Sequence, residues 1–337
     1  MEEIRWLTQR GQLINRVRIR DADQDRANPA IALHRADLQR ILVQSLPSSS
    51  IHLGNVLTTL RSDNDEVISQ FANGQTNTSE FVIGCDGIHS IIRSQLLDDA
   101  PPSYRGYSVW RGISPITPKA IPPHTAIEIY GRGKRFGLGP VGHGKTGWWA
   151  TSNTANTSLK AEERSSDRTT WKRGETTSGR SLNTQGELLR LFDGWYRPVL
   201  QLIEATSSES VLRTGAFDRR ASANIRSERI TLLGDSVHPT TPNLGQGGCM
   251  AMEDAAIIAR CFQKYGASEQ ALTAYLRVRQ RRTNAVTRYS RLYGSIGQWE
   301  NVLLRGVRRG SLSLVPEPLM RRLMQIVFDY DPNSVSV

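Results

Sequence analysis

Three glycines, Gly245, Gly247 and Gly248, stand directly before a stretch whose apolar residues have helical spacing. The first N–H groups of a helix have no acceptor within the helix, and the helix dipole makes that end electropositive. Glycine leaves these N–H groups uncovered because it carries no side chain. A phosphate or an electron-rich ring can therefore lie against this predicted helix start.

A carboxylate follows the apolar strand that leads into the same segment. We predict the strand over residues 230–233, and Asp235 comes directly after it in a Gly-Asp turn. An acidic side chain at the end of such a strand can accept hydrogen bonds from the hydroxyl groups of a ribose or a ribityl chain. An isolated aspartate could equally well cap the following loop, so the neighbouring residues decide the interpretation.

The surrounding segment resembles the second flavin motif of the class A flavoprotein monooxygenases, the para-hydroxybenzoate hydroxylase superfamily. The run GDSVHPTTPNLGQGGCMAMEDA is similar to that motif almost position by position. Two earlier blocks agree: FVIGCDGIHSIIRSQL resembles the family's Asp-Gly motif, and IALHRADLQRIL resembles its arginine-bearing helix start. The three blocks stand in the family's order. The likeness is strongest to the zeaxanthin epoxidase-like, urate hydroxylase-like and salicylate hydroxylase-like branch.

The resemblance implies an FAD site, whose cofactor-binding residues would be Arg35, Gln39, Asp86, Gly87, Arg93, Asp235, Gly245, Gly247, Gly248 and Cys249. Arg35 would neutralise the pyrophosphate, and Asp235 would bind the ribityl chain. The peptide between Gly248 and Cys249 would lie near flavin N1 and O2, while Asp86 and Arg93 belong to a motif that serves both FAD and NAD(P)H in the family. Pro242 and Asn243 would border the reacting face of the flavin and are the catalytic candidates.

The activity implied by the resemblance is the insertion of one oxygen atom from O2 into a small molecule at the expense of NAD(P)H. The substrate class would be an aromatic or polyene compound, or another lipophilic molecule, that is hydroxylated or epoxidised. Phenol hydroxylation usually needs a base, and no tyrosine or histidine stands out as one. We expect FAD as cofactor, NAD(P)H as transient co-substrate, no metal site and no nucleic-acid partner.

One element of the family pattern is missing from the sequence. Family members open with a strand, a Gly-x-Gly-x-x-Gly turn and a helix that hold the FAD pyrophosphate, whereas this chain opens with MEEIRWLTQRGQ. We therefore expect an N-terminally truncated FAD-binding domain. Three alternatives stay open: a fragment, a first unit supplied by another polypeptide, or a catalytically impaired remnant that no longer binds FAD tightly.

Two glycine patterns in the middle of the chain are rejected as nucleotide sites. Gly137, Gly139 and Gly142 have the Gly-x-Gly-x-x-Gly spacing, and residues 139–146 fit the P-loop pattern. Both motifs require a helix directly afterwards. The residues GWWATSN that follow Thr146 are instead typical of a strand, so we predict a glycine-rich hairpin.

Several residues keep a structural alternative. Arg35 could be an ordinary surface arginine of a helix, and Arg93 could pair with the aspartates at 98–99. His238 stands before a proline and is interpreted as structural rather than as a base. Trp110, Trp148 and Trp149 could line an aromatic pocket for a substrate, although tryptophans are more often core residues.

These motifs predict a mixed α/β fold class. We expect a Rossmann-like FAD/NAD(P)-binding domain interleaved with an antiparallel-sheet substrate domain and followed by a helical C-terminal region. The expected parts are a partial FAD-binding domain over 1–103, the substrate domain over 104–217 with a mobile insertion at 160–185, the second flavin motif and its helix over 218–282, and C-terminal helices over 283–337. A strand at 12–20, a helix at 35–46, a three-stranded meander within 51–87 and a helix pair within 186–205 complete the prediction.

Composition limits the remaining choices. The chain has 337 residues, of which 38% are hydrophobic, and a net charge of +11. No apolar run approaches ~18 residues, and the three cysteines lack disulfide or metal spacing, so we expect a cytoplasmic protein. The positive charge is interpreted as a solvated basic surface. The alternative is peripheral contact with an anionic membrane through the arginine-rich amphipathic segments at 277–291 and 303–328.

Overall fold

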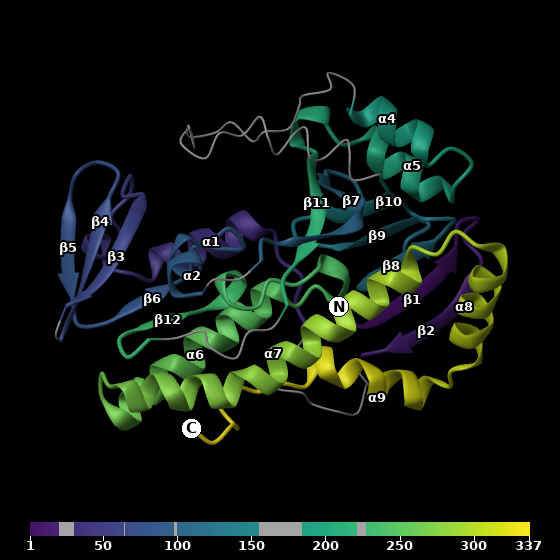
Figure 1. Ribbon diagram of the computed structural model, residues 1–337. Helices are drawn as coiled ribbons and strands as arrows, with labels where there is room; N and C mark the ends of the chain where they lie inside the picture. Colours follow the sequence, from purple (N-terminus) through teal and green to yellow (C-terminus); the bar gives the residue numbers. More distant parts are fainter. Residues whose placement is uncertain (20–29, 64, 98–99, 155–183, 221–226) are drawn as a thin grey trace. The chain divides into compact units, whose positions relative to one another are not determined.

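The structure is a computed structural model that describes residues 1–19, 30–63, 65–97, 100–154, 184–220 and 227–337 (Figure 1). The chain divides into two compact units. Unit 1 comprises Met1–Ser45, Gly106–Ala216 and Ser295–Phe328, and unit 2 comprises Leu46–Arg105, Phe217–Gly294 and Asp329–Val337. Both units combine strands and helices, which confirms the predicted mixed α/β class.

A seven-stranded sheet is the framework of unit 1, with the order β11-β7-β10-β9-β8-β1-β2. β8, β9 and β10 form an antiparallel meander, as predicted, and β7 pairs antiparallel with β10. β1 runs parallel to β8 and antiparallel to β2. The strands span β1 Glu3–Thr8, β2 Leu13–Arg18, β7 Ser103–Ser114, β8 Thr125–Tyr130, β9 Lys134–Pro140, β10 Thr146–Asn153 and β11 Leu212–Asp218.

The β9–β10 hairpin contains both glycine patterns that were rejected as nucleotide sites. Its turn lies between Pro140 and Thr146, and the chain continues from the turn as strand β10 rather than as a helix. A phosphate would therefore meet no helix dipole here. The prediction of a glycine-rich hairpin is confirmed.

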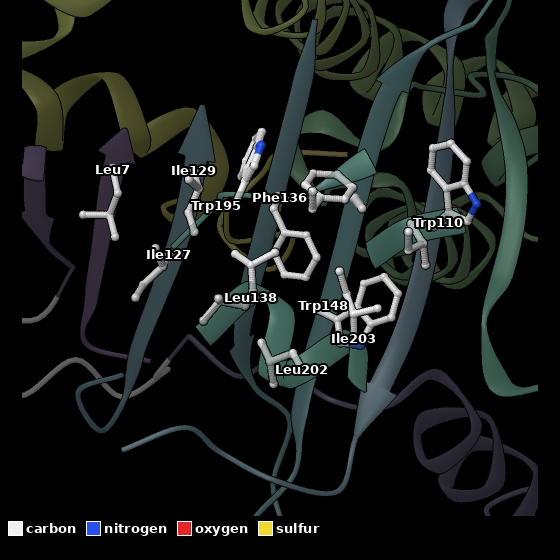
Figure 2. Packing of buried hydrophobic residues seen from close by; sticks show 14 of the residues in the cluster. Leu7, Trp110, Ile127, Ile129, Phe136, Leu138, Trp148, Trp195, Leu202 and Ile203 are labelled. Carbon is white, nitrogen blue, oxygen red and sulfur yellow. The ribbon is translucent and has the colours of Figure 1, made fainter. Parts of the chain in front are cut away.

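One face of the unit 1 sheet packs against helices α4 (Thr184–Leu191) and α5 (Arg197–Glu204). Figure 2 shows Phe136, Leu138 and Trp148 gathered beside Leu202 and Ile203. The Phe136 ring stacks on Trp148 with 5.5 Å between ring centroids. Burying each such side chain contributes about 1.5–3 kcal/mol. The predicted helix pair is confirmed, and its break lies just before Pro198, which occupies the first turn of α5.

The opposite face of the sheet carries buried charged groups among aromatic side chains, and it is distinct from the core face because successive residues of a strand point to opposite sides. Arg135 is fully buried there and its Nη1 donates to Glu128 Oε1 at 3.1 Å. The Trp149 ring lies on the same side, 5.3 Å from the Arg135 guanidinium. Trp110 and Trp148 belong to the apolar core instead. Trp110 and Trp148 therefore follow the core interpretation that the sequence favoured, and the alternative of one aromatic pocket lined by all three tryptophans is excluded.

Three helices complete unit 1. Helix α1 (Arg35–Gln44) follows the predicted span closely, and none of its residues is buried. Helices α8 (Val302–Leu314) and α9 (Glu317–Phe328) end the unit, and both contact β2. Among the described residues, no helix has the length and apolar content needed to cross a bilayer.

Unit 2 contains two small sheets. β3 (Leu57–Asp63), β4 (Glu66–Phe71) and β5 (Thr76–Ser79) form an antiparallel sheet, while β6 (Val82–Gly84) pairs in parallel with β12 (Ile230–Leu232). The expected meander therefore exists, but its third strand is β5. The apolar stretch around residues 81–84 was wrongly assigned to the meander, since its backbone pairs with a strand about 150 residues away in sequence.

The long helices of unit 2 are α6 (Gly247–Tyr265) and α7 (Glu269–Gly297), and a short helix α2 (Ile91–Leu96) follows β6. Helices α6 and α7 pack around an apolar cluster that includes Leu233, Ile257 and Tyr275, whereas α2 contributes Ile92 to a second cluster. Helix α7 belongs to unit 2 up to Gly294, and its end from Ser295 onward belongs to unit 1.

The units differ from the expected domain boundaries in two places. Residues 1–45 belong with the seven-stranded sheet because β1 and β2 complete it, whereas the expectation placed them in the partial FAD-binding domain. The expected boundary at 282/283 falls inside the continuous helix α7. Of the expected insertion at 160–185, residues 160–183 lie outside the described part of the chain.

Candidate functional site

Strand β12 leads into the turn that carries Asp235. Its three residues are buried, and a short 3₁₀ turn, Gly234–Ser236, follows directly. Gly234 has φ +66°, and a Cβ on it would lie 3.2 Å from the Ala251 Cβ, so this turn requires glycine. Within the turn Asp235 is exposed while Ser236 is buried. The Asp235 carboxylate is therefore the group of this turn that faces outward.

The loop after this turn ends at the glycine-lined start of α6. A 3₁₀ turn over Pro242–Leu244 precedes Gly245, which adopts a left-handed φ of +64°. The helix begins at Gly247, which confirms the predicted helix start. A Cβ placed on Gly245 or on Gly248 would meet no heavy atom within 4 Å. The described residues thus leave this electropositive helix end unobstructed.

Asp235 stands beside this helix start. Its Oδ1 lies 3.7 Å from the position that a Cβ of Gly247 would occupy. A carboxylate acceptor and a row of uncovered N–H donors therefore share one small surface of unit 2. Such a pair suits a ligand that carries hydroxyl groups next to an electron-rich ring or an anionic group.

Asp86, Gly87 and Arg93 lie on the other side of the same turn. Asp86 Oδ2 accepts hydrogen bonds from the N–H groups of Ile91 at 2.8 Å and Ile92 at 3.3 Å, so it caps the start of α2. Gly87 precedes this helix with φ +82°. Asp86 is exposed, and both of these hydrogen bonds are accepted by its Oδ2.

Arg93 is buried, with 1% of its surface exposed. Its Nη1 donates to the carbonyl oxygens of Ser236 at 3.0 Å and Val237 at 2.9 Å. The Arg93 guanidinium therefore binds the backbone of the Asp235 turn through two carbonyl oxygens. These contacts attach Arg93 to the Asp235 turn, and its contact with the nucleotide, which the resemblance implies, stays a prediction.

The two catalytic candidates occupy the loop before α6. Pro242 is exposed, and Asn243 is half-buried. Asn243 Nδ2 donates to Thr241 Oγ1 at 2.8 Å and to the Ser290 carbonyl at 2.9 Å. These hydrogen bonds attach the loop to α7, so the side-chain amide nitrogen of Asn243 stabilises the conformation of the loop.

Cys249 is half-buried in the first turn of α6. Burial, followed by the charge of Glu253, raises the pKa of its thiol above the ordinary value of 9.0. The thiol is therefore protonated at neutral pH and is no nucleophile. Any contribution of this residue to binding comes from its backbone.

Arg35 and Gln39 lie in unit 1. Arg35 is the first residue of helix α1, as predicted, and both side chains are exposed on the helix surface. The other predicted site residues, from Asp86 to Cys249, all belong to unit 2.

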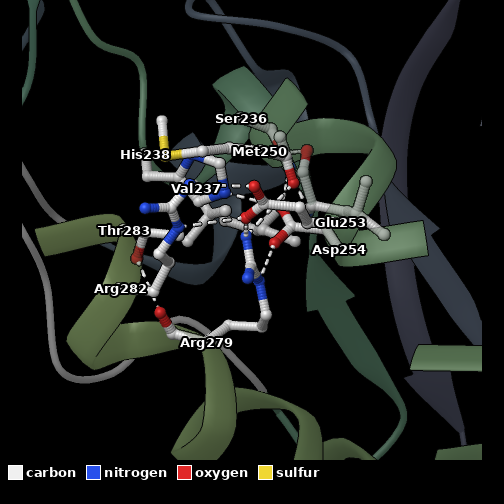
Figure 3. A network of polar contacts seen from close by, with 12 residues as sticks. Ser236, Val237, His238, Met250, Glu253, Asp254, Arg279, Arg282 and Thr283 are labelled. Carbon is white, nitrogen blue, oxygen red and sulfur yellow. Dashed lines mark hydrogen bonds and ion pairs between the residues drawn. The ribbon is translucent and has the colours of Figure 1, made fainter. Parts of the chain in front are cut away.

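A buried ionic network beneath the turn was not singled out from the sequence (Figure 3). Asp254 on α6 accepts hydrogen bonds from the Gly234 N–H and from His238, and Arg279 on α7 pairs with both Asp254 and Glu253. The Glu-Asp pair within the flavin-like run was a signal for these carboxylates. Nothing in the sequence marked Arg279 among the other arginines of its helix.

Comparison with known proteins identifies the family to which the chain belongs. A family model described as an FAD binding domain matches residues 201–290, which include the Asp235 turn and the start of α6. The aurachin C monooxygenase/isomerase of Stigmatella aurantiaca is 35% identical over 302 residues, covering 90% of this chain and 73% of that protein. The chloroplastic zeaxanthin epoxidase of Solanum lycopersicum is 32% identical over 232 residues, which are 69% of this chain and 32% of the epoxidase.

The fold has a close solved counterpart. HpxO from Klebsiella pneumoniae, whose structure contains FAD and uric acid, superposes with a TM-score of 0.82 at 25% identity, covering 96% of this chain and 79% of HpxO. The unobstructed helix start and the outward-facing Asp235 fit a flavin with its ribityl chain. The chain therefore belongs to the class A FAD-dependent monooxygenases, and its cofactor is FAD.

Proposed function

We propose that the start of α6 and the Asp235 turn together hold the flavin end of FAD. The observation that carries this proposal is the glycine-lined helix start, where a Cβ on Gly245 or Gly248 would meet no described heavy atom within 4 Å and a Cβ on Gly247 would lie 3.7 Å from Asp235 Oδ1 and from Thr240 Cγ2. The N–H groups of Gly248 and Cys249 would stabilise negative charge on the ring near N1 and O2. Asp235 would accept hydrogen bonds from ribityl hydroxyl groups.

Bound FAD supplies the redox chemistry, in which two electrons from NAD(P)H and one molecule of O2 give one oxygen atom to the substrate and one molecule of water. The chain's own residues orient the partners and exclude water. Pro242 has a fixed φ and would hold the loop rigid beside the reacting face. Asn243, through its bonds to Thr241 and Ser290, keeps that loop attached to α7.

We further propose that the substrate is an aromatic compound, a polyene or another lipophilic small molecule. The named relatives include an aurachin C monooxygenase/isomerase and zeaxanthin epoxidases, and HpxO was solved with uric acid. Hydroxylation and epoxidation are two forms of the same oxygen insertion. The proposal includes both, because the described residues of the site in unit 2 do not select one of them.

The experiment for this proposal is an FAD titration followed by oxygen uptake. Purified protein should quench the fluorescence of added FAD, and NADPH should then drive oxygen consumption that increases with a suitable substrate. Colourless protein that binds no added FAD would favour the alternative of a catalytically impaired remnant or a partner-dependent subunit. Repeating the titration with a supplied strand–Gly-x-Gly-x-x-Gly–helix segment separates these two cases.

We also propose peripheral contact with an anionic membrane, through helix α8. The burial of this helix is the reverse of the usual pattern, with a charged residue inside and apolar residues outside. Arg308 is 8% exposed, whereas Leu303 and Leu314 are 74% and 81% exposed. Arg308 donates to the carbonyls of Ile296, Gly297 and Gly131, so the charge is satisfied inside.

Charge favours a lipid surface as the occupant of this apolar stripe. Residues 301–328 contain five arginines and one carboxylate, so two copies of the segment would repel each other. An anionic headgroup layer would instead attract the arginines while Leu303, Val307 and Leu314 enter the acyl boundary.

Sedimentation with phosphatidylglycerol vesicles tests this contact. Leu303→Ser combined with Leu314→Ser should weaken binding about tenfold, because both side chains lose apolar burial. Leu53→Ser, at another exposed leucine in unit 2, is the matched control and should bind as the wild type does. Equal binding by all variants, or equal binding to phosphatidylcholine, would exclude the α8 contact.

A further inference from the structure

Asp254 receives hydrogen bonds from three directions although its side chain is completely buried. Its Oδ2 accepts from the Gly234 N–H at 2.9 Å and from His238 Nε2 at 2.6 Å, and its Oδ1 accepts from Arg279 Nε at 2.6 Å. Figure 3 shows the carboxylate between the His238 ring and the Arg279 guanidinium. Three of its four lone-pair positions are thus directed at fixed partners.

The two donors to Oδ2 lie at the two ends of one short segment. Gly234 opens the turn that follows β12, and His238 stands four residues later. Asp235 lies between them and faces outward. A single carboxylate oxygen therefore fixes both ends of the segment that presents Asp235.

Glu253 is the adjacent residue of α6 and offers an internal comparison. Its carboxylate accepts from Arg279 Nη2 at 2.7 Å and from Arg282 Nη2 at 3.0 Å. These contacts are all to α7, and none reaches residues 234–238. Glu253 and Asp254 therefore share the helix, the charge and the partner Arg279, but only Asp254 contacts the turn.

We propose that Asp254 is a positioning residue of the flavin site, which sets the orientation of Asp235 through Gly234 and His238. The inference rests on the proposed role of the Asp235 turn in holding FAD. Arg279 fixes the rotation of the Asp254 carboxylate, because its Nε binds Oδ1 while its Nη2 is held by Glu253. Arg93 binds the carbonyl oxygens of Ser236 and Val237 in the same turn. Hydrogen bonds therefore fix both N–H and carbonyl groups of this backbone.

Asp254→Asn and Glu253→Gln form the decisive pair. Each substitution removes one charge that faces Arg279, so both should lower the melting temperature. Only Asp254→Asn changes the acceptor shared by Gly234 and His238, because its amide offers one uncharged acceptor oxygen and one NH2 group to the three donors that now face two charged oxygens. We expect about tenfold weaker FAD binding for Asp254→Asn and less than twofold change for Glu253→Gln, since one charged hydrogen bond corresponds to roughly that factor.

Amide hydrogen exchange of the FAD-free protein separates this inference from the flavin proposal. Peptides covering residues 233–238 should exchange about tenfold faster in Asp254→Asn than in Glu253→Gln, because the Gly234 N–H loses its charged acceptor. Failure of the wild type to bind FAD would contradict the flavin proposal, while the exchange comparison would still decide the role of Asp254. Equal exchange, or an equal loss of FAD affinity, in the two variants would overturn the inference.

A second pair keeps the test decisive if Asp254→Asn fails to fold. His238→Phe removes one of the two donors to Oδ2, whereas His238→Gln retains a donor of similar reach. Exchange over residues 233–238 should be faster in His238→Phe and close to wild type in His238→Gln. Identical behaviour of both variants would show that the contact with Asp254 does not position the turn.

Discussion

The interior of unit 1 beside α4 and α5 is apolar, whereas the interior of unit 2 beneath the Asp235 turn is ionic. In unit 1, Phe136, Trp148 and Phe192 pack with ring centroids about 5.5 Å apart and no charged group among them. In unit 2, Asp254 and Arg279 are equally buried but joined by directional hydrogen bonds. Two interiors of one chain are thus stabilised by different forces.

The two interiors contribute differently: apolar packing stabilises the fold, whereas the ionic network fixes the geometry of the backbone around it. Apolar packing is favourable in many arrangements, because the hydrophobic effect has no direction. A buried ion pair is favourable only where every donor meets its acceptor, so it selects one geometry for the backbone around it. The ionic interior lies where the proposed flavin site needs one fixed turn, while the apolar interior supports the sheet.

The largest effect should come from the apolar interior. Phe136→Ala should lower the free energy of unfolding by about 3–5 kcal/mol, because it removes a ring that stacks on Trp148 and leaves a cavity. Urea denaturation measures this change. Ile129→Val, in the same cluster, is the milder control and should cost about 1 kcal/mol. A loss below that of the control would mean that the Phe136 contacts contribute little to the core.

A slightly smaller loss is expected from the ionic interior. Arg279→Met leaves Asp254 and Glu253 buried without their shared partner, which should cost about 3 kcal/mol. Arg282→Met removes a partner of Glu253 alone and should cost less. Unlike Phe136→Ala, the Arg279 variant should also speed amide exchange over residues 233–238. If Phe136→Ala and Arg279→Met speed amide exchange over residues 233–238 equally, the apolar and ionic interiors do not differ in how they fix the turn.

Acid should affect the ionic interior selectively. Burial alone would raise the pKa of Asp254, but the hydrogen bond and charge of His238, and then Arg279, outweigh it and hold the pKa below the ordinary 3.8. The unfolded chain therefore takes up the proton first, so stability is fully present above pH 3.8 and is lost as the pH falls through the lower folded pKa. Denaturation at decreasing pH should show this loss in the wild type and in Phe136→Ala. Asp254→Asn should show a flatter dependence, and an unchanged slope would contradict the assignment.

The sequence predicted the local parts of both regions well. Strand β12, the glycine turn and the start of α6 lie within one continuous run, so their residue types and spacing carried the information. The β9–β10 hairpin was also predicted correctly, because its turn and strand signals are contiguous.

Long-range partners were beyond the sequence. The pairing of β6 with β12, and of Asp254 with Arg279, joins residues far apart in the chain whose types fit many other partners. Arg93 was expected to reach a ligand or an aspartate, yet it is buried against two carbonyls. A charged side chain gives no sign in a single sequence of whether it faces solvent or the interior.

The smallest effect on stability should come from the ligand-facing side. Asp235→Ala should change the free energy of unfolding by less than about 1 kcal/mol, because the side chain is exposed. FAD affinity should nevertheless fall about tenfold through loss of the ribityl acceptor. Fluorescence titration compared with Glu204→Ala, an exposed carboxylate in unit 1, checks the specificity of the effect. A matching loss in the Glu204 variant would point to net charge instead.

The most direct measurement is a fluorescence titration of FAD against the wild-type chain and Gly248→Val. A Cβ at Gly248 meets nothing in the protein, so the variant should unfold within about 1 kcal/mol of the wild type. Its branched side chain would occupy the space proposed for the ring, and we predict saturable FAD binding in the wild type that is at least about tenfold weaker in the variant, a loss of roughly 1.4 kcal/mol. Equal affinity of the two proteins would contradict the central claim that the start of α6 holds the flavin.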